Sequence, residues 1–242
     1  MIPIGSKLIR ITPFNHGETK LMILEIPDFL GRIDIKRLRR IAGEATFLDG
    51  RLSNPHNKTK DNQQIDSAAP GYQESSQLIM NAMSRHEGFR NFAMPSRIAP
   101  PLLCKYEVGM AYGAHFDVAL LPLASMQTML RSDLSITLFL NDPDSYDGGE
   151  LVLQLESRKV AIKLPAGGLV VYPSTVLHEV TKVARGQRLV AITFVESQII
   201  DERKRQMIYN LGEVSALEGL TMKAENRMLL DLVRHNLIRM WS

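Results

Sequence analysis

The sequence has a single cysteine, Cys104, among 242 residues, so no disulfide can form within the chain. This scarcity is typical of proteins from a reducing compartment and predicts a cytoplasmic location. No apolar run approaches the roughly 18 residues that a membrane span needs. The first twenty residues lack the basic, then apolar, then small-residue order of a secretory signal. With no internal repeat or low-complexity tract, the sequence predicts one large globular domain or a domain with appendages, without contact to a membrane.

The chain also has little net charge, because 29 Lys and Arg are set against 26 Asp and Glu. A net charge of +3 is small for a nucleic-acid binder of this length, and no nucleic-acid partner is expected. Positive charge concentrates between Gly31 and Lys60, where eight Lys or Arg are set against three acidic residues, and "RIDIKRLRR" is the densest part. We interpret this stretch as the solvated side of an amphipathic helix, rather than a docking patch for an anion, because no aromatic residues alternate with the basic ones.

Residues 1–96 mix short strands with helices and are predicted to form a supporting region. Helices are expected at 28–42 and 75–86, and the polar stretch between them, "SNPHNKTKDNQQ", is expected to be a loop. The apolar residues expected on the inner side of the first helix are Phe29, Leu30, Ile33, Leu38 and Ile41.

Residues 97–197 change to a pattern of short strands, and 198–242 return to helix. The runs "LSITLFL", "GELVLQLE", "KVAIKL", "GGLVVYP" and "QRLVAITFVE" follow one another without helical spacers, which predicts an antiparallel sandwich or barrel within an α+β protein. In the last segment, Gly212 is expected to end one helix, and a second helix runs towards Trp241. Its apolar face is expected to carry Leu229, Leu232, Val233, Leu237 and Met240.

The stretch "YGAHFD" places two metal-binding side chains, His115 and Asp117, two residues apart. In a strand both would project from one face. By chance such a pair should occur in about 0.3 of chains with this composition, so alone it is a weak signal. Without a metal, a core histidine hydrogen-bonded to Asp117 would also account for the pair.

A third ligand is predicted at His178, which follows the apolar run "GGLVVYPSTVL". Two histidines and one carboxylate on one face leave coordination positions open and suit non-haem Fe(II) rather than a closed structural zinc site. The remaining histidines are interpreted as surface or helix residues: His16, His56, His86 and His235.

Arg188 is the fourth unusual residue, because it is predicted to share a strand face with apolar side chains. A guanidinium in such a place needs an anion, and a carboxylate matches its fork best. A dicarboxylate that chelates the metal at one end and meets Arg188 at the other would account for both features. A salt bridge at the sheet edge is the structural alternative.

Taken together, "YGAHFD", "SDLSITLFLNDPDSYDGGELVL", "IKLPAGGLVVYPSTVLHEVTKVARGQR" and "NQQ" resemble the PKHD-type hydroxylases, from about Ile26 to the end of the chain. These are bacterial Fe(II)- and 2-oxoglutarate-dependent dioxygenases related to prolyl 4-hydroxylases. The resemblance implies a double-stranded β-helix (jelly-roll) core, with N-terminal supporting helices and a C-terminal helical segment. It implies iron ligands at His115, Asp117 and His178, and 2-oxoglutarate bound by Arg188 and Tyr106. It also admits ascorbate as an additional cofactor.

The implied reaction uses dioxygen to hydroxylate an organic substrate and converts 2-oxoglutarate to succinate and carbon dioxide. The resemblance permits peptidyl proline, a free small molecule or a compound of iron uptake as substrate. One departure is the tract after Asp117, "VALLPLASMQTML", which is more apolar than the family leads us to expect. Two alternatives remain at this point: a cupin-like metalloenzyme that does not use 2-oxoglutarate, and a non-catalytic sensor of iron or 2-oxoglutarate.

Overall fold

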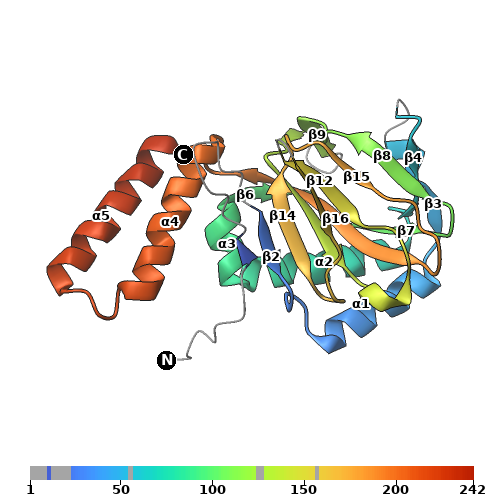
Figure 1. The fold of residues 1–242 in the computed structure, drawn as a ribbon, viewed down its shortest axis with the longest axis horizontal. Coiled ribbons are helices and arrows are strands. Elements are labelled where there is room, and N and C mark those ends of the chain that lie inside the picture. Colours follow the sequence, from blue (N-terminus) through green and yellow to red (C-terminus); the bar gives the residue numbers. More distant parts are fainter. Residues whose placement is uncertain (1–9, 12–22, 54–56, 124–127, 156–157) are drawn as a thin grey trace.

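Two antiparallel β-sheets face each other, helices cover the outer face of the larger sheet, and a helical hairpin extends from the body (Figure 1). The computed structural model describes residues 10–11, 23–53, 57–123, 128–155 and 158–242. In this part of the chain, no helix is long and apolar enough to cross a membrane.

The larger sheet has nine strands in the order β1-β2-β14-β11-β16-β7-β5-β3, with β6 pairing with β16. Every pair in it is antiparallel. Its strands are β1 (Arg10–Ile11), β2 (Leu24–Ile26), β3 (Phe47–Asp49), β5 (Gln63–Ile65), β6 (Pro95–Ile98), β7 (Leu102–Tyr106), β11 (Leu134–Phe139), β14 (Leu169–Pro173) and β16 (Arg188–Ser197).

The smaller sheet has five strands in the order β13-β12-β15-β8-β4, and a separate hairpin pairs β9 with β10. The bounds of these strands are β4 (Lys60–Asp61), β8 (Ala111–His115), β9 (Leu120–Leu123), β10 (Thr128–Arg131), β12 (Leu151–Leu155), β13 (Arg158–Ile162) and β15 (His178–Val180). Two short 3-10 helices complete the connections, at Gly50–Ser53 and Pro143–Ser145.

The central strand β11 is buried along its whole length, because both of its faces are covered. Leu134 and Leu138 belong to the core between the larger sheet and the helices, whereas Phe139 belongs to the core between the two sheets. A strand covered on both sides reads as a nearly continuous apolar run. This burial explains why "LSITLFL" has no alternating pattern and is still a strand.

Three helices support the larger sheet: α1 (Arg32–Glu44), α2 (Pro70–Arg85) and α3 (Glu87–Ala93). Both helices predicted for this region are therefore present, although α1 begins four residues later than expected and α2 five residues earlier. At about 100° per residue, Ile35, Leu38 and Ile41 share the inner side of α1, whereas Ile33 lies far around the helix from them and is 85% exposed. The prediction that Ile33 faces inward was wrong. The basic residues of α1 lie on its solvent side, as expected.

The polar stretch predicted as a loop contains two strands, β4 and β5. Lys60, Asn62 and Gln64 are buried there despite their polarity. β4 extends the smaller sheet beside β8, and β5 joins β7 and β3 in the larger sheet. Strands from the first 96 residues thus enter both sheets. The division of the chain into a supporting region (1–96), a jelly-roll core (97–197) and a helical segment (198–242) stays a prediction.

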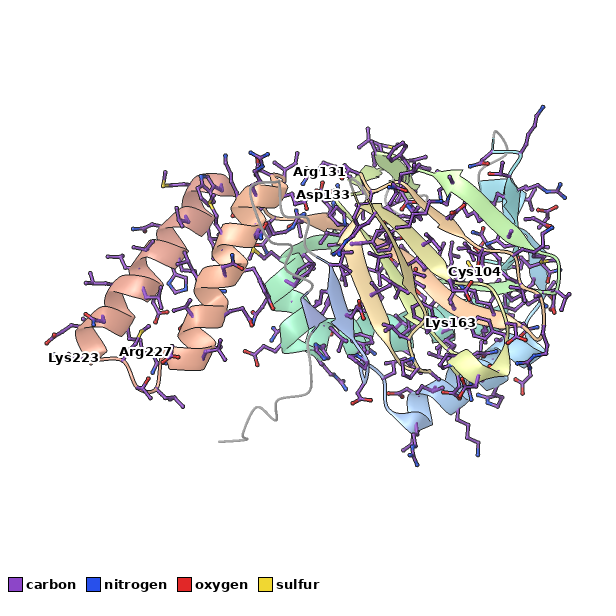
Figure 2. All side chains as sticks on the ribbon, viewed as in Figure 1. Cys104, Arg131, Asp133, Lys163, Lys223 and Arg227 are labelled. Carbon is purple, nitrogen blue, oxygen red and sulfur yellow. The ribbon has the colours of Figure 1, made fainter. Side chains whose placement is uncertain are left out.

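The last part of the chain forms the helices α4 (Glu202–Glu218) and α5 (Ala224–Trp241). Gly212 lies inside α4, so the prediction that it ends a helix was wrong. A Cβ at Gly212 would lie 3.3 Å from Nε of Arg234, which shows that the side chain of Arg234 packs against this glycine. The pair α4–α5 projects from the body as a hairpin, and Lys223 and Arg227 mark its far end (Figure 2).

Candidate active site

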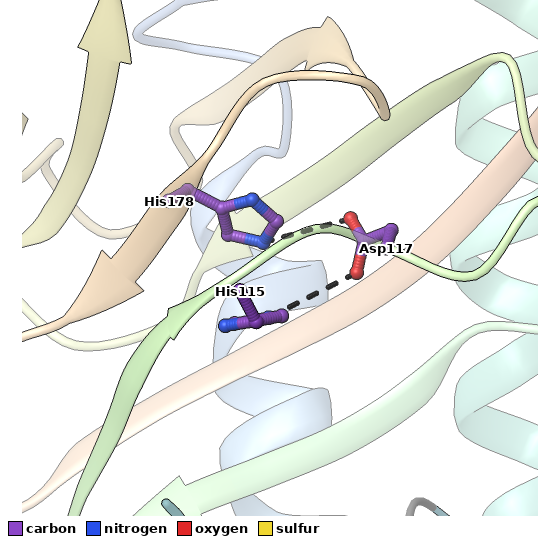
Figure 3. A group of neighbouring side chains, drawn as sticks. All are labelled: His115, Asp117 and His178. Carbon is purple, nitrogen blue, oxygen red and sulfur yellow. Dashed lines mark ion pairs between the residues drawn. The ribbon is translucent and has the colours of Figure 1, made fainter. Parts of the chain in front are cut away.

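His115 and His178 lie side by side on neighbouring strands of the smaller sheet (Figure 3). His115 is the last residue of β8, His178 is the first of β15, and the two are paired in the antiparallel register. Their ring centroids are 4.2 Å apart. Asp117 follows two residues beyond the end of β8 and turns its carboxylate towards both rings.

Both imidazoles use Nδ1 for a bond to the backbone and leave Nε2 to face Asp117. Nδ1 of His115 lies 2.7 Å from the carbonyl oxygen of Gly113, and Nδ1 of His178 lies 2.9 Å from that of Val176. Because a carbonyl oxygen only accepts, Nδ1 carries the proton and Nε2 keeps its lone pair. Such a bond is the usual outer-shell partner of a metal-binding histidine.

The free donor atoms converge without forming hydrogen bonds to one another. Nε2 of His178 lies 3.5 Å from Oδ2 of Asp117, and Nε2 of His115 lies 4.0 Å from Oδ1. One donor atom from each residue lies within 4.8 Å of the others. Burial, and then the neighbouring His178, lower the pKa of His115 to about 4. At neutral pH this ring is uncharged, as a metal ligand must be.

Two nitrogens and one carboxylate oxygen at these separations fit a divalent transition metal bound by one face. Three protein ligands leave further positions open for exogenous molecules. The set offers no thiolate, which separates it from the closed cysteine-rich sites of structural zinc.

A serine pair that the sequence did not point to holds the carboxylate of Asp117. Ser135, on β11 of the opposite sheet, donates from Oγ to Oδ2 of Asp117 at 2.5 Å. Its hydroxyl is also 2.8 Å from that of Ser174. Ser135 inside the apolar strand β11 was the signal in the sequence, but a serine in a strand is too common to indicate a site by itself.

Aromatic rings hold the imidazoles from the other sides, and these contacts were also not predicted. Tyr112 stacks on His115 with ring centroids 3.6 Å apart and planes inclined by 16°. Lys60, on the neighbouring strand β4, places Nζ 5.4 Å from the centre of the Tyr112 ring. Tyr172 meets His178 edge-on at 5.2 Å. Each of the two imidazoles is thus fixed by a backbone hydrogen bond and an aromatic neighbour.

Arg188 is only 1% exposed, and among the described residues it forms no ion pair. It begins β16 opposite Tyr106 of β7. Its guanidinium carbon lies 4.9 Å from the ring centre of Tyr106 and 5.6 Å from that of Phe139. Its Nε is buried without a hydrogen-bond partner. A buried cation without an anion is costly, so this site fits an anionic ligand and not a salt bridge at the sheet edge.

The two halves of the site line one cavity between the sheets. It encloses about 460 Å³, including its open mouth. Its walls include the predicted residues His115, Asp117, His178, Arg188 and Tyr106. Ile192 and Phe194 also line it, which agrees with the predicted apolar face around Arg188.

Tyr106 contributes its hydroxyl to this cavity in the neutral form. Burial raises the pKa of Tyr106 well above its ordinary value, and Asn62 is the hydrogen-bond partner of the hydroxyl. Asn62 is itself buried and lines the cavity. It comes from the polar stretch that was expected to be a loop.

The other two described histidines, His86 and His235, lie apart from this cluster. His86 is half-buried, accepts a hydrogen bond at Nδ1 from the backbone NH of Phe89 and so caps α3. It is therefore not the simple surface residue that was expected. His235 lies exposed on α5, as predicted for a residue of the last helix. His16 and His56 lie outside the described residues.

The family model and the most similar relatives point to the same family of proteins. The model of the 2OG-Fe(II) oxygenase superfamily matches residues 102–196. A PKHD-type hydroxylase of Sphingopyxis alaskensis is 45% identical over 219 residues, covering 90% of this chain and 99% of that protein. The PKHD-type hydroxylase YbiX of Shigella dysenteriae is 38% identical over 224 residues, covering 91% and 99%.

Solved structures confirm the jelly-roll fold that was predicted. A prolyl-4-hydroxylase of Pseudomonas putida superimposes with a TM-score of 0.51 at 22% identity, covering 72% of this chain and 92% of that one. A prolyl hydroxylase of Trichoplax adhaerens, in complex with a hypoxia inducible factor peptide fragment, gives a TM-score of 0.53 at 17% identity, covering 76% and 86%.

Proposed function

Because the chain belongs to the PKHD-type hydroxylases, and so to the enzymes that use Fe(II) and 2-oxoglutarate, we propose that it hydroxylates a C–H bond of an organic substrate. One oxygen atom of dioxygen enters the substrate and the other enters succinate, which is formed from 2-oxoglutarate with release of carbon dioxide. The observation that supports this most directly is the single cavity shared by the three donor side chains and the unpaired Arg188.

Under this proposal His115, Asp117 and His178 hold the iron. Fe(II) bound there supplies the activation of dioxygen, and the chain supplies the geometry. The backbone bonds of the two histidines keep both Nε2 atoms aimed at one point. Ser135 holds Oδ2 of Asp117, which leaves Oδ1 free to face the metal.

Arg188 and Tyr106 bind the far carboxylate of 2-oxoglutarate under the same proposal. The planar guanidinium suits a carboxylate because it offers two parallel hydrogen bonds. Tyr106 is neutral and keeps a proton to donate, while Asn62 orients its hydroxyl. Fixing one end of the co-substrate orients its other end towards the metal ligands across the cavity.

The substrate approaches the same cavity, whose neighbourhood is apolar. Phe116, Val118 and Leu120, which surround Asp117 in the chain, are all exposed. We propose that these side chains contact the substrate. Peptidyl proline, which the two prolyl hydroxylases suggest, and apolar small molecules are the classes to test first.

The first experiment does not require the substrate. Fe(II) and then 2-oxoglutarate are added to the apoprotein without oxygen, and the visible charge-transfer band of the chelate is recorded. We expect the band in the wild type, its absence in His178→Ala and its weakening in Arg188→Ala. Iron binding without a band would refute the use of 2-oxoglutarate and restore the cupin-like alternative.

The second experiment tests turnover. Succinate formation from 2-oxoglutarate is measured with and without each candidate, and a true substrate should accelerate it. A purely binding protein would give the band and no succinate with any candidate. Family membership and the open metal site both speak against such a sensor.

A further inference from the structure

Three buried polar side chains lie in the stretch from β4 to β5, where the sequence predicted a loop. Lys60, Asn62 and Gln64 are buried, whereas Asp61 is exposed and Gln63 is half-buried. This alternation is that of an extended chain with one side turned inward. Burying a polar group is costly unless it makes a polar contact, so each of the three inward residues needs a partner.

Asn62 lies opposite Tyr106 across the strand pair β5–β7. The antiparallel register of this pair sets Gln64 opposite Cys104, and two residues further along the same register Asn62 comes beside Tyr106. On the other side of β7, Tyr106 is opposite Arg188 of β16. Opposite residues of neighbouring strands project to the same face. Asn62, Tyr106 and Arg188 therefore form one row across three strands, and all three line the cavity.

Gly50 determines how the side-chain amide of Asn62 is turned. The backbone NH of Gly50 donates to the carbonyl oxygen of Asn62 at 2.8 Å. A Cβ at Gly50 would overlap Oδ1 of Asn62, so this oxygen rests directly on the glycine. Oδ1 accepts no hydrogen bond in the part of the chain that the structure describes. The amide therefore meets the hydroxyl of Tyr106 through Nδ2.

The hydrogen bond between Asn62 and Tyr106 has a defined direction, because an amide nitrogen can only donate. The hydroxyl oxygen of Tyr106 accepts from Nδ2, which leaves the hydroxyl proton for a ligand in the cavity. The pKa of Tyr106 agrees with this direction: burial raises it, and the bond from Asn62 opposes the rise, as a donor does. Arg188, next in the row, also has only donors. The row thus presents O–H and N–H groups to one ligand.

We propose that Asn62 is a positioning residue that makes this cavity select 2-keto acids carrying a second carboxylate. The inference rests on the proposed function, in which Arg188 and Tyr106 bind the far carboxylate of 2-oxoglutarate. Because Asn62 keeps the Tyr106 proton directed at the ligand, the hydroxyl and the guanidinium both donate, which suits carboxylate oxygens, since these only accept. Asn62 lies outside residues 102–196, which the family model matches.

Two keto acids separate this role from a general effect on the cavity. 2-Oxopentanoate has a methyl group where 2-oxoglutarate has its far carboxylate. Dissociation constants for both are measured without oxygen from the charge-transfer band of the Fe(II) complex. The wild type should bind 2-oxoglutarate far more tightly than 2-oxopentanoate.

Replacing Asn62 should weaken the binding of 2-oxoglutarate alone. We expect a loss of about 10-fold in Asn62→Ala, because one hydrogen bond that orients Tyr106 is removed. Asn62→Asp should cost about 100-fold or more, because the introduced carboxylate takes the Tyr106 proton and competes for Arg188. The affinities for 2-oxopentanoate and for Fe(II) should stay unchanged in both variants.

Gln63→Glu is the matched control, because it makes the same change from amide to carboxylate at the next residue. Gln63 is not among the described residues that line the cavity, so this variant should bind both keto acids like the wild type. A double variant tests whether Asn62 acts through Tyr106. In Tyr106→Phe there is no hydroxyl to orient, so adding Asn62→Ala should weaken 2-oxoglutarate binding no further.

Equal losses of affinity for both keto acids would make Asn62 a structural residue only and overturn the inference, as would an unchanged 2-oxoglutarate affinity in Asn62→Asp. Additive effects of Asn62→Ala and Tyr106→Phe would also overturn it. A wild type that gives no band, or that binds both keto acids equally, would instead refute the proposed function beneath it. Should Asn62→Asp not fold, because a buried carboxylate is costly, Asn62→Ala and its combination with Tyr106→Phe decide.

Discussion

Ser135 and Asp117 come from opposite sheets, and the 2.5 Å hydrogen bond between them joins the sheets at the proposed metal site. Ser135 lies on β11, in the middle of the larger sheet, whereas Asp117 follows β8 of the smaller one. The position of the carboxylate therefore depends on how the two sheets pack, and not only on the local chain around "YGAHFD".

Replacing Ser135 by Ala should weaken Fe(II) binding about 10-fold or more, because the loss of an outer-shell partner leaves the ligand carboxylate less well oriented. Titration of the apoprotein with Fe(II) against a competing chelator, without oxygen, measures this change. Ser132→Ala is the control: the Ser132 hydroxyl is buried and has no hydrogen-bond partner in the described part of the chain. Equal iron affinity in both variants would contradict the role of Ser135.

Replacing His178 by Ala should abolish stoichiometric Fe(II) binding at micromolar concentrations, because only two of the three ligands would remain. The same titration tests it, and circular dichroism checks that the fold persists. His235→Ala, on the exposed side of α5, should bind iron like the wild type. Retention of full iron binding by the His178 variant would remove this residue from the site.

Replacing Arg188 by Lys should raise the dissociation constant for 2-oxoglutarate about 10- to 100-fold, while Fe(II) binding stays the same. Lysine keeps the charge but loses the two parallel hydrogen bonds of the guanidinium. The dissociation constant is obtained by measuring the intensity of the charge-transfer band at increasing concentrations of 2-oxoglutarate. Arg185→Lys provides the comparison, because Arg185 is exposed and paired with Asp147. An unchanged constant in the Arg188 variant would place the anchor elsewhere.

Replacing Gly149 by Ala should destabilise the fold by about 1–3 kcal/mol, because Gly149 has a φ of +67°, where other residues are strained. The new Cβ would also lie 3.0 Å from Cδ of Arg188 and so displace a residue of the proposed 2-oxoglutarate site. Urea unfolding measures the stability. In contrast, Gly43→Ala on α1 meets no atom within 4 Å and should stabilise the helix by up to about 1 kcal/mol. If Gly149→Ala left the free energy of unfolding unchanged, the turn would tolerate a side chain at this position.

The core strands, and the residues that the structure gathers in the candidate site, could be predicted from the sequence because their residue types and spacing are distinctive. Arg188 is a cation inside an apolar strand, and His178 directly follows an apolar run. The strands of the two sheets are buried on one or both faces, so they read as dense runs of Val, Ile and Leu. Such signals depend only on residue type and spacing.

Other features depend on contacts that the sequence does not show. Lys60 and Asn62 look like loop residues, yet they lie in or between strands because their polar groups face the site and its aromatic wall. Gly212 remains helical because Arg234, from another helix, packs against it. The error at Ile33 has a different cause: the spacing of about 100° per residue already places Ile33 away from Leu38 and Ile41 on α1, so grouping it with them was a mistake in applying the helical period.

Cys104 lies completely buried on β7, two residues from Tyr106 (Figure 2). Burial raises the pKa of its thiol to about 11. Oxidation of cysteine proceeds through the thiolate, and at neutral pH almost none is present here. If the neighbouring cavity is the iron site, as proposed, the enzyme keeps its only cysteine beside that site in the protonated form, which resists oxidative damage.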